Sequence, residues 1–219
     1  MEGQKHTYSL DRKTLVVGLL IVLFHAVGLS GFLNPEWHSL FIALVPFHLL
    51  LMFLLMLISQ KTWNRDFIIF LLVIYSAGFA IEYFGVHTGL IFGSYHYGAT
   101  LGFQLSEIPL IIGINWILMI YSAGVTIGYL PINQVWLKSV LAAAMLVGLD
   151  LLIEPVAIRF DYWSWANEII PIQNYVAWFV FSFLCFRFFY GMKFDKQNPA
   201  AVVLLVAQLL FFIALNLWA

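Results

Sequence analysis

Residues 67–97 read FIIFLLVIYSAGFAIEYFGVHTGLIFGSYHY, an apolar run that holds a carboxylate near its end and then passes into a loop rich in glycine and aromatic residues. A helix needs about 20 apolar residues to span the hydrocarbon core of a bilayer, and the run over 67–85 has that length. Ionisable side chains at membrane depth are costly and are functional candidates by default. The stretch therefore predicts a transmembrane helix that carries the carboxylate of Glu82 toward a functional loop.

The composition of the whole chain agrees with a membrane protein. Of its 219 residues, 63% are hydrophobic and 10% are charged, whereas soluble domains have about 25% charged residues. We therefore expect one integral membrane domain over residues 1–219. The net charge of −1 offers no broad basic surface, so no nucleic-acid partner is expected.

Seven apolar runs are long enough to cross a bilayer as helices. They occupy residues 14–33, 38–59, 67–85, 107–129, 135–157, 172–190 and 200–218. The first run follows basic residues, as a signal peptide does, but it is long for a signal sequence and has no clear cleavage site, so we interpret it as a retained helix. The sequence thus predicts an all-α fold, a polytopic transmembrane helical bundle of about seven spans.

Basic residues gather at one end of this predicted bundle. They are Lys5, Arg12, Lys13, Lys61, Arg65, Lys138, Arg187, Lys193 and Lys196. Arg159 falls at the other end. Because Lys and Arg accumulate on the cytoplasmic side of membrane proteins, we expect a cytoplasmic N-terminus, an outside C-terminus and multi-pass insertion in the cell (plasma) membrane.

This topology brings four carboxylates toward the outer face of the membrane: Glu82, Glu107, Asp150 and Glu154. Asp150 and Glu154 are spaced i, i+4, so they share one face of a helix. Two neighbouring carboxylates cannot easily both ionise where the dielectric constant is low, and the one that keeps its proton can act as a general acid. The alternative is a structural pair whose partners are Arg159 or tyrosine hydroxyls.

The region between Glu82 and Glu107 contains five glycines. It predicts either a re-entrant or interfacial loop over the outer mouth of the bundle or an ordinary exterior loop. His87 and His96 in this region are candidate partners for the acids, but their spacing does not predict a metal site. For Asp161, which follows the fifth span, simple contact with water at a helix end is the favoured alternative.

Other polar residues lie inside predicted spans. Asn115 predicts either a hydrogen bond between helices or a donor in a pocket. His25 and His48 in the first two spans are interpreted as hydrogen-bonded packing residues. The chain has no dinucleotide fingerprint and no P-loop, and the seventh predicted span has no lysine for a retinal Schiff base. No cofactor is therefore expected.

Several motifs are similar to those of one known family. They read Glu82-x-x-Gly85-Val86-x-Thr88-Gly89, Phe92-Gly93-x-Tyr95-x-Tyr97, Asp150-x-x-x-Glu154-Pro155, Asp161-Tyr162-Trp163-x-Trp165 and Pro171-x-x-Asn174-Tyr175. With them the chain resembles the carotenoid biosynthesis protein family, which includes CruF-type carotenoid 1,2-hydratases and bisanhydrobacterioruberin hydratases. The resemblance covers most of the chain from the third span to the sixth.

The resemblance implies addition of water across the terminal C1=C2 bond of an acyclic carotenoid end group, without a redox cofactor. This chemistry needs a protonated carboxyl that gives its proton to C2, and aromatic faces that stabilise the tertiary carbocation at C1 by cation–π attraction. It also needs a second carboxylate that positions and deprotonates the water. We assign the acid to Glu82 or Asp150, and water activation to Glu154 or Glu107.

The remaining candidate residues are expected to contact the substrate. The expected aromatic walls are Tyr83, Tyr95, Tyr97, Trp116, Trp163 and Trp165. The expected polar contacts are His87, His96, Asn115, Arg159, Asp161 and Asn174. The expected partners are a carotenoid, water and the lipid bilayer, together with other carotenoid enzymes, and the site is expected toward the outer leaflet.

Two other functions remain open at this point. An enzyme similar to lycopene cyclases begins with the same protonation, but an internal double bond of the substrate captures the cation. A non-enzymatic carotenoid-binding or transport protein uses intramembrane acids as a proton relay. The lack of an inverted repeat counts against a transporter.

Overall fold

The computed structural model describes residues 11–218, so Lys5 of the orientation argument lies outside the described residues. Seven long helices make up most of this part of the chain. They are α1 (Arg12–Phe32), α2 (His38–Ser59), α3 (Arg65–Thr88), α4 (Ile111–Gly128), α5 (Val135–Arg159), α6 (Ile172–Gly191) and α7 (Pro199–Trp218). By length and composition all seven can cross a membrane, which is consistent with the predicted helical bundle of about seven spans.

The predicted helix limits differ most from the observed ones in α3 and α4. α3 continues to Thr88, so Glu82 lies inside the helix rather than at its end. α4 begins at Ile111 instead of residue 107. Ser106 and Glu107 have φ angles of +49° and +67°, and a right-handed helix cannot contain that left-handed conformation. The prediction that Glu107 opens the fourth helix is therefore wrong.

Local capping determines where α3 begins and ends. At its start, Oδ1 of Asn64 accepts a 2.9 Å hydrogen bond from the backbone N–H of Phe67, which satisfies one of the free donors of the first turn. At its end, Gly89 takes a left-handed conformation with φ of +64°, which glycine adopts without steric cost. These caps set the position of Glu82 along the bundle.

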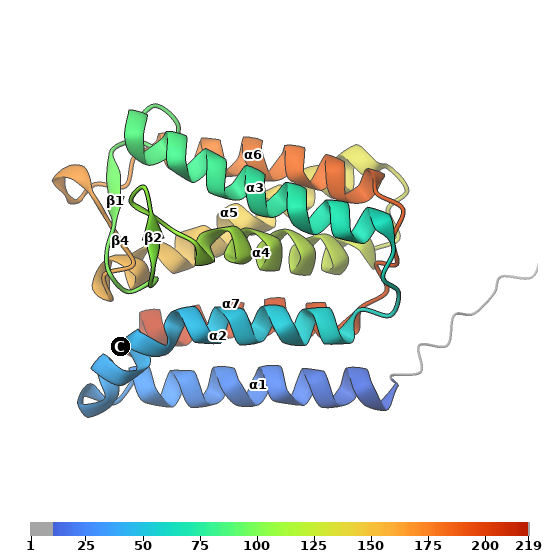
Figure 1. Cartoon of the computed structure of the whole chain (residues 1–219), viewed down its shortest axis with the longest axis horizontal. Coiled ribbons are helices and arrows are strands. Elements are labelled where there is room, and N and C mark those ends of the chain that lie inside the picture. Colours follow the sequence, from blue (N-terminus) through green and yellow to red (C-terminus); the bar gives the residue numbers. More distant parts are fainter. Residues whose placement is uncertain (1–10, 219) are drawn as a thin grey trace, which may run out of the picture.

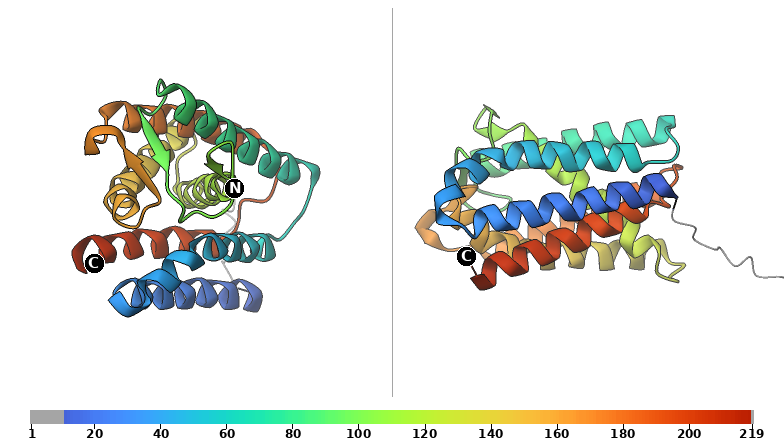
Figure 2. Two further views of the ribbon diagram at one scale, coloured as in Figure 1. Left: turned by 60° about the vertical axis from the view of Figure 1, so that its left-hand side comes forward. Right: turned by 90° about the horizontal axis from the view of Figure 1, so that it is seen from below.

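The helices lie side by side in layers (Figure 1). α1 forms one edge of the bundle, α2 and α7 cover it, α4 and α5 follow, and α3 and α6 form the opposite edge. The left-hand view in Figure 2 shows the same order. Contacts between elements agree, because α1 packs on α2 and α7, α3 packs on α4, and α5 runs along α6.

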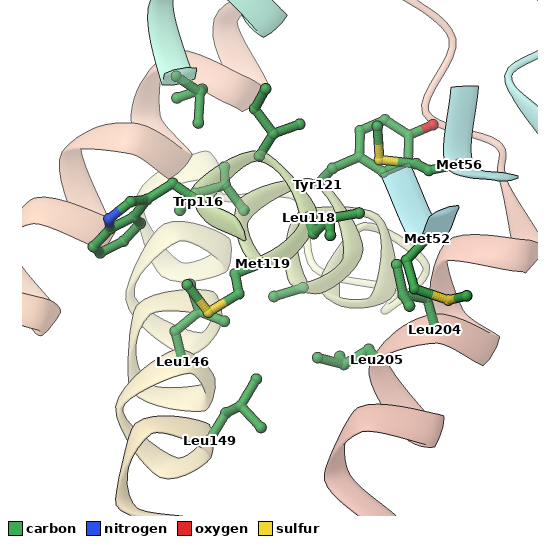
Figure 3. Close-up of a cluster of buried hydrophobic side chains, with 14 of the residues drawn as sticks. Met52, Met56, Trp116, Leu118, Met119, Tyr121, Leu146, Leu149, Leu204 and Leu205 are labelled. Atoms are coloured by element: carbon green, nitrogen blue, oxygen red, sulfur yellow. The ribbon is translucent and has the colours of Figure 1, made fainter. Parts of the chain in front are cut away.

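α4 is the central helix of the bundle. Of its 18 residues, 13 are buried, so it is surrounded by other helices rather than by lipid. In Figure 3, Met119 lies toward Leu146 of α5, while Leu118 lies toward Met52 of α2. Trp116 of the same helix is fully buried and points away from the α2 side chains in this view. α4 therefore packs against helices on several sides of the bundle.

Four short strands lie together at one end of the bundle, which we call the strand end (Figure 1). β1 (Tyr95–Tyr97) pairs antiparallel with β4 (Trp163–Trp165), and β2 (Gln104–Leu105) pairs with β3 (Ile108–Pro109). The all-α prediction is incomplete here. Tyrosine and tryptophan favour strands, and side chains alternate between the two faces of a strand, so the β1–β4 ribbon can present an aromatic face to the bundle.

Candidate active site

Glu82 is buried inside α3, with 4% of its surface exposed. Three side chains donate hydrogen bonds to it. Oε2 accepts from the hydroxyls of Tyr95 at 2.5 Å and Tyr97 at 2.8 Å, and Oε1 accepts from Nε1 of Trp116 at 3.0 Å. A buried polar group is stable only when its hydrogen-bonding capacity is met. The three donors therefore allow a carboxyl group to lie among aromatic rings.

Two glycines on α3 make room for these donors. A Cβ atom at Gly78 would lie 2.6 Å from Cδ1 of Trp116. A Cβ atom at Gly85 would lie 2.7 Å from Cδ2 of Phe92 and 3.1 Å from the hydroxyl oxygen of Tyr95. All three distances are shorter than ordinary van der Waals contact. Glycine at these positions is thus required by the close approach of the groups that surround Glu82.

A second pair of carboxyl groups lies on α5. Asp150 and Glu154 are buried, with exposures of 0% and 1%, and Asn174 of α6 bridges them. Nδ2 of Asn174 donates to Oδ2 of Asp150 at 2.9 Å and to Oε1 of Glu154 at 3.3 Å. Oδ1 of Asp150 has no hydrogen-bond partner among the described residues. Residues spaced i, i+4 lie on the same face of a helix, and here both carboxyl groups contact the same amide.

The second oxygen of Glu154 is held by the β1–β4 ribbon. Nε1 of Trp163 donates to Oε2 at 3.0 Å, and Nε1 of Trp165 donates to the same atom at 2.8 Å. An indole N–H can donate but not accept, and the amide nitrogen of Asn174 also only donates. All three partners of Glu154 therefore donate, and both of its oxygens act as acceptors.

One antiparallel ribbon therefore serves both carboxyl sites. Tyr95 is paired with Trp165 in the register, and Tyr97 is paired with Trp163. The tyrosines of β1 reach Glu82, while the tryptophans of β4 reach the carboxylate on α5. Burial, followed by the nearby Glu82 charge, raises the pKa of both tyrosine hydroxyls above the ordinary value of 10.0. They are therefore neutral donors at physiological pH.

A small cavity of about 30 Å³ lies between these groups. Its lining includes Glu82 and Glu154 together with Asn174 and an aromatic wall. The wall consists of Phe92, Tyr95, Tyr97, Trp116, Trp163, Trp165 and Trp178. About 10–15 Å³ is enough space for one water molecule in a polar site. The cavity, which we call the acid chamber, can therefore hold water between two carboxyl groups.

A larger cavity of about 330 Å³ adjoins the acid chamber. It is lined mostly by apolar and aromatic residues of α1, α2, α4, α5 and α7. The two cavities share Ile112, Asn115 and Trp163 in their walls. We call the larger one the apolar cavity. The arrangement suits a long apolar molecule whose end reaches a compartment that contains carboxyl groups.

Glu107 does not join the other three acids. Its side chain is 74% exposed, and its Oε2 lies 3.6 Å from Nε2 of His87. His87 pairs through Nδ1 with the carbonyl oxygen of Tyr83 at 2.8 Å, and the rings of these two residues stack with centroids 4.3 Å apart. The structure does not bring Tyr83, His87 and Glu107 together with the buried acids, because all three lie outside both cavities.

Three more candidates lie outside both cavities. His96 is exposed and contacts the hydroxyl of Ser164 at 2.8 Å on the outer face of the ribbon, because alternate strand residues face opposite ways. Nη1 of Arg159 donates to the carbonyl oxygen of Leu215 in α7 at 3.1 Å. Oδ2 of Asp161 accepts from the backbone N–H of Ala99 at 3.3 Å. These residues hold the loops and α7 in place.

Trp178 belongs to the acid chamber although its sequence position was not singled out. It is buried and stacks on Trp116, with ring centroids 4.5 Å apart. It follows Asn174 by four residues on α6, so it lies on the same helix face. That spacing is the signal that could have identified it. Phe92, in contrast, enters the chamber through loop packing, which no local pattern predicts.

The histidines of the first two spans line the apolar cavity rather than the acid chamber. Nδ1 of His25 is 2.8 Å from the carbonyl oxygen of Ile21, which confirms a hydrogen-bonded histidine within the helix. Between residues 11 and 218 the structure contains no group of three histidine, cysteine or carboxylate residues arranged to hold a metal ion.

Comparison with known proteins gives one family. The model of the carotenoid biosynthesis protein family matches residues 40–219 of the chain. Bisanhydrobacterioruberin hydratase of Haloarcula japonica is 33% identical over 116 residues. That match covers 49% of this chain and 38% of the relative, so the chain matches less than half of the length of this curated relative. No solved structure matches.

Proposed function

Because this chain belongs to the carotenoid biosynthesis protein family, we propose that it is a carotenoid 1,2-hydratase that needs no cofactor. The proposed reaction adds water across the terminal C1=C2 bond of an acyclic end group. The observation that carries the proposal is the shared wall between the apolar cavity and the acid chamber, where Ile112, Asn115 and Trp163 line both spaces. The name of the relative, a hydratase, also supports it.

The substrate enters this arrangement end first. The polyene lies in the apolar cavity, where burial of hydrocarbon is favourable by roughly 25 cal/mol per Å². The end group reaches the shared wall beside Asn115 and Trp163. The terminal double bond then faces Glu82 and Glu154, which line the far compartment.

Glu82 is the proposed general acid. The two partners of its Oε2 are the hydroxyls of Tyr95 and Tyr97. Hydroxyl groups both donate and accept, so they are compatible with a protonated carboxyl as well as with a carboxylate. Glu82 can therefore give a proton to C2 of the substrate and remain hydrogen-bonded as the carboxylate that forms.

Glu154 is the proposed base. Its three partners only donate, which suits a carboxylate, and it shares the acid chamber with the space for a water molecule. The water oxygen bonds to the cation at C1 while Glu154 accepts one of its protons. The cycle closes when that proton returns to Glu82, so the net change is the addition of one water with no oxidation or reduction.

Asp150 lines neither cavity and is proposed to position other groups. It accepts from the same Asn174 amide that contacts Glu154. The proposed roles of acid and base then fall to Glu82 and Glu154, which line the acid chamber. Removing the carboxylate of Asp150 is expected to displace the Asn174 amide. The displaced amide would then no longer position Glu154, the proposed base.

Aromatic rings supply the remaining requirement, which is stabilisation of the carbocation. Ring faces attract a desolvated cation by about 2 kcal/mol or more. Trp163 lies in the walls of both cavities, and the stacked pair of Trp116 and Trp178 closes part of the acid chamber. A cation that forms at C1 near the shared wall is thus surrounded by electron-rich rings.

The proposed membrane placement follows the positive-inside rule. We propose that the chain is one membrane domain with a cytoplasmic N-terminus in the plasma membrane, and that the strand end faces outward. The acid chamber then lies toward the outer leaflet, close to the water it consumes. Enzymes that supply acyclic carotenoids, or consume hydrated ones, are the proposed protein partners.

The test is pigment analysis by chromatography and mass spectrometry after expression in cells that accumulate lycopene or another open-ended carotenoid. A product heavier by one water supports hydration. An isomer of unchanged mass with ring end groups overturns hydration in favour of cyclisation. Unchanged pigment across several substrates, with the chain present in the membrane, favours a binding or transport protein instead. The Glu82→Gln variant serves as the control for background chemistry.

A further inference from the structure

The apolar cavity contains a polar cluster that the proposed chemistry does not use. The cluster consists of His25 of α1, His48 of α2 and Gln208 of α7, all of which line the cavity. Most of the other lining residues are hydrocarbon or aromatic side chains. Polar side chains exposed to an apolar cavity are costly unless they meet a partner. The cluster therefore needs a partner of its own.

The two histidines are in direct contact. Their ring centroids are 4.8 Å apart in an edge-to-face arrangement. Nδ1 of His25 is 2.8 Å from the carbonyl oxygen of Ile21, and a carbonyl oxygen only accepts, so Nδ1 carries the hydrogen. In the neutral ring, Nε2 of His25 is then an acceptor. His25 is 7% exposed, so this acceptor is enclosed within the bundle.

Gln208 contributes a buried acceptor to the cluster. Its side chain is 8% exposed, and its Oε1 is buried without a hydrogen-bond partner among the described residues. It lies at about the level of His25, because Gly18 faces Val203 and Gly28 faces Phe211 along the neighbouring helices α1 and α7. A buried polar atom without a partner destabilises the fold, so a ligand that supplies a donor here is favoured.

The acceptors define the chemistry of the missing group. The amide oxygen of Gln208 and Nε2 of His25 both require a donor, which a ketone or an ether does not provide. The cavity is too apolar for a charged ligand, because its walls hold no acidic or basic side chain besides the two histidines. A hydroxyl group donates one hydrogen bond and accepts others, so it can donate to one of these two acceptors while its oxygen accepts from an N–H of His48 or Gln208.

We propose that His25, His48 and Gln208 form a second polar subsite, which binds a hydroxyl group carried by the polyene substrate away from the reacting double bond. The inference rests on the proposed function, since it takes a carotenoid as the occupant of the apolar cavity. It makes the chain selective for acyclic carotenoids that already contain oxygen over plain hydrocarbons. The reaction that precedes it is then one that introduces a hydroxyl group.

Binding can be measured without turnover. The full chain contains eight tryptophans, and polyene binding near them quenches their fluorescence. The experiment titrates purified protein in lipid nanodiscs with acyclic polyenes that have the same end group, with and without one hydroxyl placed at successive positions along the chain. Wild-type protein is expected to bind one hydroxylated isomer about tenfold more tightly than the hydrocarbon, as one or two neutral hydrogen bonds predict.

The Gln208→Leu variant is expected to lose this preference while its affinity for the hydrocarbon stays equal or increases. Val206→Ala is the matched control, since Val206 lies on the same helix, is 46% exposed and lines neither cavity, so the preference should persist in it. Equal binding of every isomer by the wild type overturns the inference. A preference that survives in Gln208→Leu also overturns it, because water then satisfies the cluster.

These outcomes are separable from the proposed function. Hydration of hydrocarbon and hydroxylated polyenes at equal rates, with equal affinities, supports the hydratase and rejects the subsite. Selective binding without any hydrated product supports the subsite and rejects the hydratase. His25→Phe provides a second variant, which keeps a ring at this position but removes the acceptor.

Discussion

The hydroxyl of Tyr95 donates a 2.5 Å hydrogen bond to Oε2 of Glu82 and so joins a strand of the loop region to a carboxyl group inside a transmembrane helix. Through the register of the ribbon, Tyr95 is also the neighbour of Trp165, which donates to Glu154. The two proposed catalytic groups are therefore connected through one pair of strand residues. Movement of the ribbon is therefore expected to change the hydrogen bonds of Glu82 and Glu154 together.

Glu82→Gln is expected to reduce the hydration rate by about 10²–10⁴-fold, the usual contribution of a general acid. The amide keeps the shape of the side chain but has no acidic proton to transfer. Glu107→Gln is the matched control, because Glu107 is exposed on the β2–β3 turn, and it should retain full activity. Product formation per unit of membrane-inserted protein measures both. Equal rates for the two variants contradict the assignment of Glu82.

Gly85→Ala is expected to reduce activity by at least tenfold while the helix remains folded. The added Cβ would lie 2.7 Å from Phe92 and 3.1 Å from the Tyr95 hydroxyl, so the ribbon must shift away from Glu82. Gly148→Ala on α5 meets no atom within 4 Å, and alanine stabilises helix interiors by up to about 1 kcal/mol. That control should keep its activity. A Gly85→Ala enzyme with normal rates contradicts this prediction, because activity then does not require Phe92 and the Tyr95 hydroxyl to lie close to α3.

Tyr97→Phe is expected to slow hydration, because one of the three donors to Glu82 is lost. A neutral hydrogen bond contributes about 0.5–1.5 kcal/mol, which corresponds to a change of roughly twofold to tenfold. His96→Ala changes the neighbouring residue of the same strand, whose side chain faces outward, and it should leave the rate unchanged. Steady-state rates of the two purified variants test this prediction, and equal rates for Tyr97→Phe and His96→Ala contradict it.

Asn174→Leu is expected to lower the thermal stability of the detergent-solubilised protein. The variant leaves Asp150 and Glu154 without the amide that they share, and unsatisfied buried groups cost about 1–3 kcal/mol each. Val176→Ala is the control on the same helix, since Val176 is 57% exposed and lies on the outer surface of the bundle. A melting temperature for Asn174→Leu equal to that of the control contradicts the bridging role.

The stability of the chain is expected to fall above about pH 10. The folded chain holds the hydroxyl protons of Tyr95 and Tyr97 more tightly than the unfolded chain, because burial raises the pKa of both above 10.0. Stability is therefore unaffected by these groups below pH 10 and decreases as the pH rises beyond it. Melting curves from neutral to alkaline pH measure the effect, and the Tyr95→Phe, Tyr97→Phe double variant should show a weaker decrease.

The sequence alone predicted the seven spans, because the length of an apolar run can be compared directly with the thickness of a bilayer. It also predicted that Asp150 and Glu154 share a helix face, since that relationship depends only on the helical repeat. Both predictions concern residues that are close together in the chain, where local geometry is sufficient.

Tertiary structure alone decided which acids meet. Glu82 and Glu107 were equivalent as loop-flanking carboxylates, but α3 extends to Thr88 and buries the first, while the left-handed turn at Ser106 leaves the second in solvent. The pairing of Tyr95 with Trp165 joins residues that are far apart in the sequence. Such a register depends on how the loops pack against the finished bundle, and no periodicity within either segment contains that information.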